Sequence, residues 1–408
     1  MEIPSRKPLV FSRSGLVCSG GATKAAAFHI GVCLALRDLG FTFVGGKAVN
    51  PAAPGSVGLA KYHPQQIATY VGSSAGALIV TLLAAGVEIE SIINAFSSDS
   101  EFKIPSALKE IPKLTYRDIL RVSFPTPTSL WKSLRKSGVF AKTLESLVLK
   151  NLRLPGFFST KGLADWLKKM LPTEQFHELQ ADLFVIGTQL DHSRKIIFGR
   201  YGTEKSTDGY SQYASGACIS DSVAASMSLP PLFVPYLVAH GEGKPRYYVD
   251  GEIRETLSTH VAKDNGCDLL ICSYTHQPYH YRTDTGSLYD YGMPAIVIQA
   301  IYQAIEQKIY GAKRAHENKL MALETVREFF KEKNLGEDAS QELSRRLQER
   351  LDFKESLNYL FIHPEPRDKE MFFGDHFTLN PETLQKVVTI GYRRTMALFR
   401  KYELRPVL

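Results

Sequence analysis

The sequence has no uninterrupted stretch of the roughly 18 apolar residues that a membrane-spanning helix needs. Its first eight residues contain charges and prolines and lack the apolar core of a secretory signal peptide. The five cysteines are odd in number and never in C-x-x-C spacing, so we expect reduced core residues rather than disulfides or a structural metal site. These absences favour a cytoplasmic protein whose contact with a membrane is at most peripheral.

Motifs for nucleotides and nucleic acids are also missing. Neither the P-loop pattern G-x-x-x-x-G-K-[ST] nor the dinucleotide fingerprint G-x-G-x-x-G occurs. The formal net charge is +7, from 49 basic and 42 acidic residues, which is too small to indicate a nucleic-acid partner. The chain has 408 residues, of which 44% are hydrophobic, so it is long enough to bury one large core or two modest ones.

The stretch 70–78 contains a G-x-S-x-G pattern, with Ser74 between Gly72 and Gly76. A β-like run at 67–71 precedes it, and an uncharged, small-residue helix is expected over 74–85. In that setting the serine sits at a sharp strand-to-helix turn that exposes its hydroxyl, and the helix N-terminus directs peptide N–H groups at an anion nearby. Because the pattern is common, a glycine-serine turn before a core helix remains the alternative.

A second glycine turn lies near the start of the chain. A short apolar strand at 15–18 leads into Gly20, Gly21, Ala22 and Lys24, and a helix is expected over 25–39. A strand, a glycine turn and a helix in this order present free backbone N–H groups to an anion. Since the P-loop pattern is absent, that anion could be an oxyanion rather than a phosphate. A tight turn without a ligand is the alternative.

The segment 101–170 differs in composition from the rest of the chain. It holds 14 basic and 5 acidic residues, a local net charge of +9, and both tryptophans, Trp131 and Trp166. Within it, 130–136 has an apolar stripe beside a basic one. Such a surface suits an anionic bilayer, at roughly 1 kcal/mol for each well-placed basic residue. We expect a basic, cap-like helical insertion that meets a membrane; a solvated insert with ordinary lysines is the alternative.

Further strands and helices alternate along the chain, which indicates an α/β fold with a mostly parallel sheet and helices on both faces. Asp250 ends a β-like run and precedes Gly251. Open α/β sheets have their catalytic and binding groups at the carboxyl ends of strands, so an acid here is a candidate site residue. We expect a single domain over 1–408, in which 285–408 is a helical C-terminal extension. The expected strands are 183–188, 195–199, 246–250, 268–272 and 357–362, and the expected later helices are 222–229, 293–350 and 381–402.

A reactive serine needs a base, which is either a histidine paired with an aspartate or a carboxylate acting directly. Ser74 and Asp250 followed by His260, His276 or His280 would have the chain order of a hydrolase triad. The glycine turn at the very start of the domain and the undistinguished settings of these histidines favour a carboxylate instead.

Three ordered stretches resemble the motifs of patatin-like phospholipases. Residues 19–32 are similar to the opening motif of the family, in the variant where G-G-G-x-[K/R] is followed by A-A-A-F-H. Residues 72–76 match the G-x-S-x-G of the family, and 249–251 match its D-G-[G/A] motif. The likeness spans about residues 10–275 and returns at 357–402. Weaker matches lie at 156–171, 186–190 and 225–233.

This resemblance implies a patatin-like three-layer sandwich and a lipid acyl hydrolase of the phospholipase A type. Ser74 would be the nucleophile, and Asp250 would deprotonate it directly and later activate water. The resemblance implies no calcium or other cofactor; it implies a phospholipid or other acyl-lipid substrate. The remaining site residues that it implies are Gly20, Gly21 and Ala22 as oxyanion donors, Lys24 as a nearby positive charge, and Gly72, Gly76 and Gly251 as supporting glycines.

Two positions depart from the family pattern. Ala22 replaces the third glycine of the first motif, with a small expected effect, and Glu252 stands where the family usually has glycine or alanine. We expect Glu252 to point to solvent, and Asp250 to be shielded from water with a raised pKa. The alternatives are a lipid transacylase or acyltransferase, a neutral-lipid lipase with the same dyad, and a non-catalytic membrane-binding protein on a patatin scaffold. An activating protein partner remains open.

Overall fold

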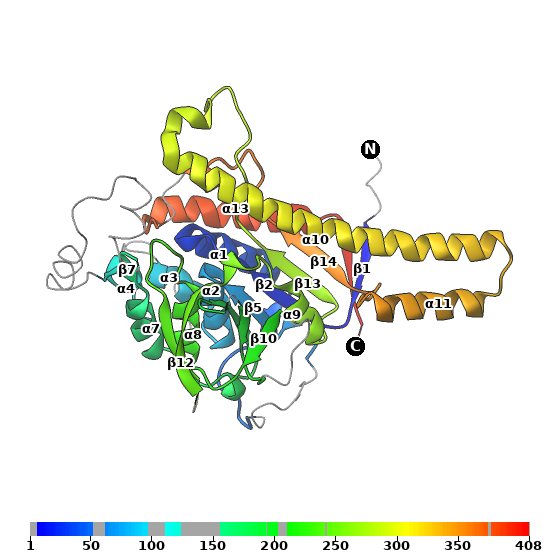
Figure 1. Cartoon of the computed structure of the whole chain (residues 1–408), viewed down its shortest axis with the longest axis horizontal. Coiled ribbons are helices and arrows are strands. Elements are labelled where there is room, and N and C mark those ends of the chain that lie inside the picture. The colour runs from blue at the N-terminus through cyan, green and yellow to red at the C-terminus, as the bar shows by residue number, and fades with distance from the viewer. Residues whose placement is uncertain are drawn as a thin grey trace, which may run out of the picture.

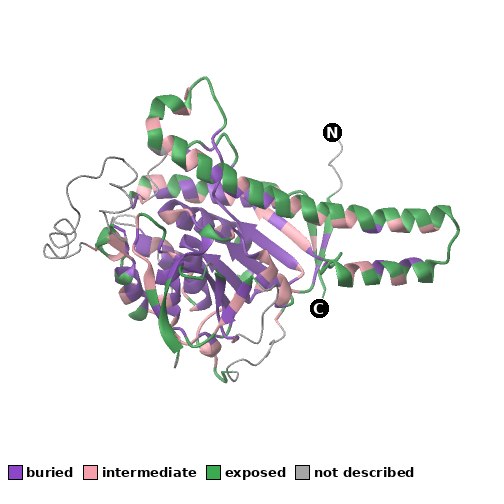
Figure 2. Cartoon of the chain, viewed as in Figure 1, coloured by how far each residue is buried: buried purple, intermediate pink, exposed green. Residues whose placement is uncertain are grey.

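The computed structural model describes residues 6–51, 62–96, 111–123, 156–192, 194–202, 210–240, 243–373 and 377–407. Within these residues a central β-sheet lies between two layers of helices, and a long helical hairpin projects from one side (Figure 1). Figure 2 shows the sheet buried and the surface of the projecting hairpin mostly exposed. The predicted α/β architecture is confirmed.

Within the described residues nine strands form the central sheet, in the order β10-β9-β8-β5-β2-β13-β14, with β12 beside β8 and β11 beside β12. Five of the strand pairings are parallel and three are antiparallel, so the sheet is mostly parallel, as predicted. The strands are β2 (Ser14–Cys18), β5 (Thr69–Ser73), β8 (Asp182–Gln189), β9 (Arg194–Phe198), β10 (Ser211–Ala214), β11 (Tyr236–His240), β12 (Gly243–Asp250), β13 (Leu269–Ser273) and β14 (Asn358–Ile362).

Alternating side chains of each strand enter two separate cores. In β2, Leu16 and Cys18 pack into the core shared with helices α1, α2, α3, α8 and α13, whereas Val17 packs into the core shared with α9 and α10. The helices are α1 (Ala22–Asp38), α2 (Ala75–Ala84), α3 (Ile89–Phe96), α4 (Tyr116–Ile119), α7 (Lys161–Lys168), α8 (Ile219–Ser226), α9 (Thr259–Asp264), α10 (Gly292–Glu332), α11 (Glu337–Arg350), α12 (Glu370–Phe373) and α13 (Pro381–Phe399).

Short elements complete the fold. Strand β1 (Lys7–Phe11) pairs in parallel with β15 (Tyr402–Pro406), so the two ends of the described chain lie side by side. The remaining pairs are β3 (Thr42–Phe43) with β4 (Gln66–Ile67) and β6 (Arg121–Val122) with β7 (Phe158–Ser159); the 3-10 helices are η3 (Phe176–Glu178), η4 (Gly251–Ile253) and η5 (Leu288–Tyr291).

The helical region predicted over 293–350 consists of two helices. α10 crosses the core and continues beyond it, and α11 returns alongside its far half (Figure 1). Asn334 adopts a left-handed backbone with φ of 53°, and Gly336 caps α11. A left-handed residue ends a helix because it cannot continue the right-handed geometry. Among the described residues, no helix combines the length and the apolarity that a bilayer crossing requires.

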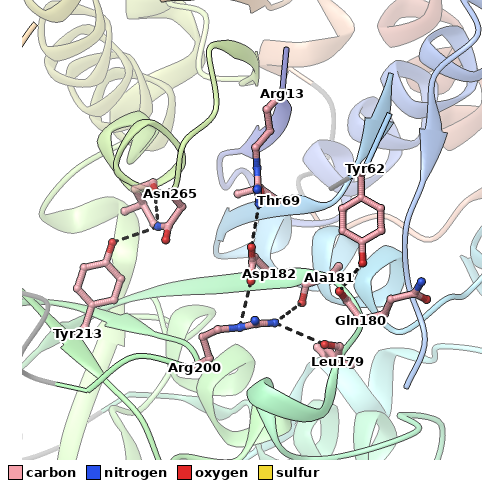
Figure 3. Close-up of polar contacts among 11 residues, drawn as sticks. Arg13, Tyr62, Thr69, Leu179, Gln180, Ala181, Asp182, Arg200, Tyr213 and Asn265 are labelled. Carbon is pink, nitrogen blue, oxygen red and sulfur yellow. Dashed lines mark hydrogen bonds and ion pairs between the residues drawn. The ribbon is translucent and has the colours of Figure 1, made fainter. Parts of the chain in front are cut away.

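A buried ionic cluster fixes the amino ends of β5 and β8 (Figure 3). One carboxylate oxygen of Asp182 lies 3.0 Å from the guanidinium of Arg13, and the other lies 3.0 Å from Nε of Arg200. Arg13 also donates to the hydroxyl of Thr69 at 3.0 Å. The cluster therefore joins four segments at the amino ends of β5 and β8, whereas Ser74 follows the carboxyl end of β5.

The cysteine prediction is confirmed, because all five cysteines are free thiols. The prediction of a tryptophan-bearing membrane surface is wrong for Trp166, which is 3% exposed in α7 and donates its indole N–H to the carbonyl of Pro112. Trp131 and the stretch 130–136 lie outside the described residues. Described parts of the segment 101–170 do contribute Leu114, Ile119 and Leu163 to the wall of a cavity.

Candidate active site

A cavity of about 480 Å³ opens at the carboxyl ends of β2, β5 and β12. Its walls are mostly apolar, and α10 supplies one of them through Ile298, Ile301 and Ile305. The groups with hydroxyl, carboxyl, imidazole or backbone N–H chemistry that line it come from segments far apart in the sequence. They include Gly21, Ala22, Thr23, Ser74, Asp250, Glu252, His276 and Tyr302, and Lys308 adds an ammonium group.

Ser74 occupies the sharp turn between β5 and α2, as the sequence predicted. Its backbone has φ of 51° and ψ of −127°, a combination that L-residues rarely adopt and that costs about 1–3 kcal/mol. Ser226 in α8 stabilises this turn, because its Oγ accepts the N–H of Ser74 at 2.8 Å and donates to the carbonyl of Ile186 at 2.6 Å. The hydroxyl of Ser74 faces the cavity, and the residue is 8% exposed.

Three of the supporting glycines allow close packing around this turn. A Cβ on Gly76 would lie 2.3 Å from the carbonyl oxygen of Cys18, where α2 meets the end of β2. A Cβ on Gly251 would lie 2.4 Å from the carbonyl oxygen of Ile186, and one on Gly72 would lie 2.5 Å from Cα of Ala77. Since real Cβ atoms do not approach other atoms so closely, larger residues would displace the turn.

The glycine turn after β2 presents two backbone amides to the same cavity. Gly21 has φ of 129° and Ala22 has φ of 57°, so the turn is left-handed at both residues. In the part of the chain that the structure describes, neither amide donates to a protein acceptor, and both residues line the cavity. They are therefore available to an anion that forms at Ser74. Gly20, the third predicted donor, has its amide engaged elsewhere.

His29 supports this turn from behind. Its Nε2 donates to the carbonyl of Ser19 at 2.8 Å, and its Nδ1 accepts from the hydroxyl of Ser273 at 2.7 Å. Burial lowers the pKa of His29 to about 4, so the ring is neutral and can make both bonds at once. Because Ser19 also donates its amide to Ser273, the ends of β2 and β13 are fixed together beside the turn.

Asp250 reaches the cavity from an unexpected direction. β12 runs antiparallel to β8, with Asp250 opposite Gly187, and the next residue back along β8, Ile186, is opposite Ser73 in β5. This register places Asp250 beside Ser74, whose hydroxyl stabilises the charged form of the carboxyl. One oxygen also accepts the amide of Glu252 at 2.9 Å. Burial raises the pKa of Asp250 to about 7, although its hydrogen bonds oppose this shift.

Glu252 does not point to solvent, and that prediction is wrong. The residue is 8% exposed, lines the cavity, and accepts the amide of Gly20 on Oε1 at 2.8 Å. Burial, together with the nearby charge of Asp250, raises the pKa of Glu252 to about 8. Two buried carboxyl groups thus share one cavity with Ser74.

Lys24 is buried in α1, and its ammonium donates to the carbonyl of Met371 at 3.1 Å. Lys24 is not among the residues that line the cavity. The structure therefore assigns its charge to the contact between α1 and α12, while the sequence predicted a place beside the oxyanion.

Of the three histidines that could complete a triad, only His276 lines the cavity. Its ring packs edge-on against Tyr302, with the centroids 5.2 Å apart. His260 instead lies beside Lys195 and Glu255, and His280 is exposed. Asp250 contacts Ser74 directly, so the arrangement offers a carboxylate as the immediate partner of the hydroxyl.

Sequence reasoning missed two contributors to this site. Ser226 lies within one of the weaker matching stretches, and only its contact with the amide of Ser74 identifies its role. The other contributor is the apolar face of α10, where the sequence predicted only a helical region over 293–350. Partial exposure of Ile301 within that face distinguishes a cavity wall from a packed core, and exposure is not visible in the sequence.

An exposed-turn serine, a carboxyl partner, two free amides and apolar walls on an α/β scaffold define a lipid acyl hydrolase. Comparison with known families agrees. The family model for patatin-like phospholipase matches residues 16–263, which is more than half of the chain. The chain belongs to the patatin-like phospholipase family. The match includes Ser74 and Asp250, and it ends before α10.

Proposed function

We propose that this chain is a phospholipase of the A type, which cleaves fatty acyl esters through an acyl-Ser74 intermediate with Asp250 as the base. The observation that carries the proposal is that Ser74 lies beside a buried carboxyl group and that both line an apolar cavity. A carboxyl group with a pKa of about 7 is a stronger base than an ordinary aspartate and is still ionised in part at neutral pH.

In the first step the hydroxyl of Ser74 attacks the ester carbonyl and transfers its proton to Asp250. The carbonyl oxygen becomes an oxyanion that accepts hydrogen bonds from the amides of Gly21 and Ala22. Collapse of this tetrahedral intermediate breaks the bond to the lysolipid alcohol, which leaves with the proton from Asp250. Each positioned donor in such a site contributes roughly 2.7–4 kcal/mol to stabilising the transition state in other serine hydrolases.

In the second step water replaces the lysolipid. The water oxygen attacks the acyl-serine carbonyl while Asp250 takes a proton from that water. The same two amides stabilise the second oxyanion. Collapse returns the proton to Ser74 and releases the fatty acid. If another alcohol enters in place of water, the product is a new ester, which is the transacylase reaction.

The apolar walls favour an acyl chain as the bound part of the substrate, because each buried methylene contributes about 0.8 kcal/mol. Leu229, Ile253 and Ile301 line the cavity and are also 43–52% exposed, so they form its rim. Met293 and Val297 precede Ile301 at intervals of four on α10 and are exposed as well. This surface supports peripheral contact with a membrane, and the basic segment 101–170 supports a preference for anionic lipid.

The experiment that tests the proposal compares wild type, Ser74→Ala and Asp250→Asn on vesicles of a mixed lipid extract, with the released fatty acids and lysolipids identified by mass spectrometry. We expect both variants to lose product while keeping their circular dichroism spectrum. Turnover retained by Asp250→Asn would exclude the dyad. Loss of product in His276→Gln would favour a triad.

Two controls separate the alternatives. Labelling of Ser74 by a fluorophosphonate probe shows a reactive serine even where an activating partner is missing from the vesicle assay, and an unlabelled serine would favour the non-catalytic scaffold. Addition of a long-chain alcohol to the assay distinguishes hydrolysis from acyl transfer, because only the latter gives a new ester.

Membrane contact has its own test. We expect Met293→Glu and Val297→Glu to weaken co-sedimentation with phosphatidylglycerol vesicles, because each places a charge in an apolar surface. Met321→Glu, which changes an equally exposed residue on the far half of α10, is the matched control. Binding by wild type that does not change with salt would contradict an electrostatic contribution.

A further inference from the structure

Gly20 is held between Ser74 and Glu252. Its amide donates to Oε1 of Glu252 at 2.8 Å, and a Cβ on Gly20 would lie 2.7 Å from Cβ of Ser74 and 2.9 Å from Cγ of Glu252. No other residue fits at this position, because both neighbours are already in contact. The carboxyl of Glu252 therefore sets the position of the turn whose next two amides face the cavity.

We propose that Glu252 is a positioning residue for acyl transfer that acts as a neutral carboxylic acid. In this form its carbonyl oxygen accepts the amide of Gly20 and fixes the turn, while the negative charge of the pair stays on Asp250. The inference rests on the proposed chemistry at Ser74, and it goes beyond that chemistry because this role belongs to a side chain that the family motif lacks.

The two carboxyl groups form a buried pair. Asp250 and Glu252 are two residues apart, both are buried, and both line one cavity. Two carboxyl groups that share a buried site do not ionise together, because the second charge is opposed by the first and by the loss of solvent. Burial raises the pKa of both carboxyl groups, so near neutral pH the pair carries a single negative charge.

Asp250 and Glu252 differ in the hydrogen bonds that they accept. Asp250 accepts the amide of Glu252 and lies beside the hydroxyl of Ser74, and both groups favour its charged form. Glu252 accepts from Gly20 through one oxygen, which a neutral acid does as well as a carboxylate. Its other oxygen is buried without a hydrogen-bond partner among the described residues, which costs less free energy for a neutral acid than for a carboxylate.

Other titratable groups around the cavity do not reverse this distribution of charge. Tyr302 in α10 has a pKa raised by burial and stays neutral. Lys308, also in α10, is exposed at the cavity wall, so solvent and salt screen its charge. His276 follows β13 and packs against Tyr302. On the side away from the cavity, Glu255 is paired with Lys195 and His260.

The proposal has a consequence for the pH dependence of the reaction. Ionisation of Asp250 creates the base, so kcat/KM rises through a pKa of about 7. Ionisation of Glu252 then places a second negative charge beside the forming oxyanion, so kcat/KM falls through a pKa of about 8. Wild type should show a narrow bell-shaped profile.

The test measures kcat/KM on a soluble short-chain ester across this pH range for wild type, Glu252→Gln, Glu252→Ala and the control Glu255→Gln. Glutamine keeps the carbonyl acceptor and removes the ionisation, so we expect its profile to lose the alkaline limb and to plateau. Alanine removes the acceptor, and we expect kcat to fall about tenfold or more with little change in KM. Glu255→Gln should keep the wild-type bell.

Two results would overturn the inference: an alkaline limb that persists in Glu252→Gln, or equal loss of kcat in the glutamine and alanine variants. Fluorophosphonate labelling of Ser74 and circular dichroism of each variant show whether the nucleophile and the fold are intact. If wild type neither labels nor hydrolyses ester, the proposed function fails. If wild type does both and the glutamine variant behaves like alanine, only the role of Glu252 fails.

Discussion

The hydroxyl of Ser226 accepts a hydrogen bond from the backbone N–H of Ser74 at 2.8 Å and donates one to the carbonyl of Ile186 at 2.6 Å. A residue in the helix after β10 thus connects the strained turn of the nucleophile to the central strand β8. This contact satisfies an amide that no helix or strand could satisfy, because the backbone of Ser74 belongs to neither.

Ser226→Ala should therefore both destabilise the fold and slow the reaction. It leaves a buried donor and a buried acceptor without partners, at about 1–3 kcal/mol, and it releases the turn that orients the Ser74 hydroxyl. Urea unfolding and the rate of fluorophosphonate labelling measure the two effects. Ser222→Ala is the control in the same helix, because the Ser222 hydroxyl only donates to the carbonyl of Cys218 one turn earlier. Equal rates in the two variants would contradict the role of Ser226.

Asp250→Asn should stabilise the protein at alkaline pH. Folding raises the pKa of Asp250 from 3.8 to about 7, so the folded state favours the protonated carboxyl. The free-energy cost begins as the pH rises through the unfolded value and is complete above about 7, where it is on the order of 4 kcal/mol. We expect the Tm of the variant to match wild type near pH 4 and to exceed it near pH 8. A constant difference in Tm across this range would contradict the burial effect.

Asp182→Ala should lower the free energy of unfolding without changing the chemistry of the site. The substitution leaves the guanidinium groups of Arg13 and Arg200 without their buried counter-charge, which costs about 3–5 kcal/mol. The cluster lies at the amino ends of β5 and β8, whereas Ser74 follows the carboxyl end of β5. The labelling rate of Ser74 in the folded variant should therefore stay at the wild-type value. Asp352→Ala is the control, since the pair of Asp352 with Lys263 is exposed and contributes at most about 1 kcal/mol.

Gly76→Ala should lower the free energy of unfolding and Gly311→Ala should raise it, although both residues are helical. A Cβ on Gly76 would collide with the backbone of Cys18, so we expect a loss of about 1–3 kcal/mol and of most Ser74 labelling. Gly311 in α10 is exposed with no atom within 4 Å of an added Cβ, so alanine should stabilise by about 0.5–1 kcal/mol. Equal stabilities measured by urea unfolding would contradict this difference.

The parts of the site that depend on local sequence were predictable. The turn at Ser74 follows from small residues on both sides and an uncharged helix after them, all within a dozen positions. The strand that ends in Asp250 was also predicted, although its antiparallel direction was not, because the orientation of a strand depends on its partner β8. The pairing of Asp250 with Gly187 joins segments separated by more than 60 residues.

The parts that depend on distant contacts were not predictable. Glu252 turns inward because the amide of Gly20, 232 residues earlier, is there to receive it. Lys24 turns away from the site because the carbonyl of Met371 lies 347 residues later in the sequence. Neither orientation leaves a trace in the residues beside Glu252 or Lys24. The roles of Ser74 and Asp250 remain predictions until the variants are measured.

The wall that α10 contributes lies outside the region that matches the family, whereas Ser74, Asp250 and the glycine turn lie within it. The side chains of the α10 wall can therefore change without a change in Ser74, Asp250 or the glycine turn. Substitutions at Ile298, Ile301 or Ile305 would change which acyl chains enter without touching the bond-breaking groups. Exchange of this helix between relatives would be a way to transfer chain-length selectivity from one enzyme to another.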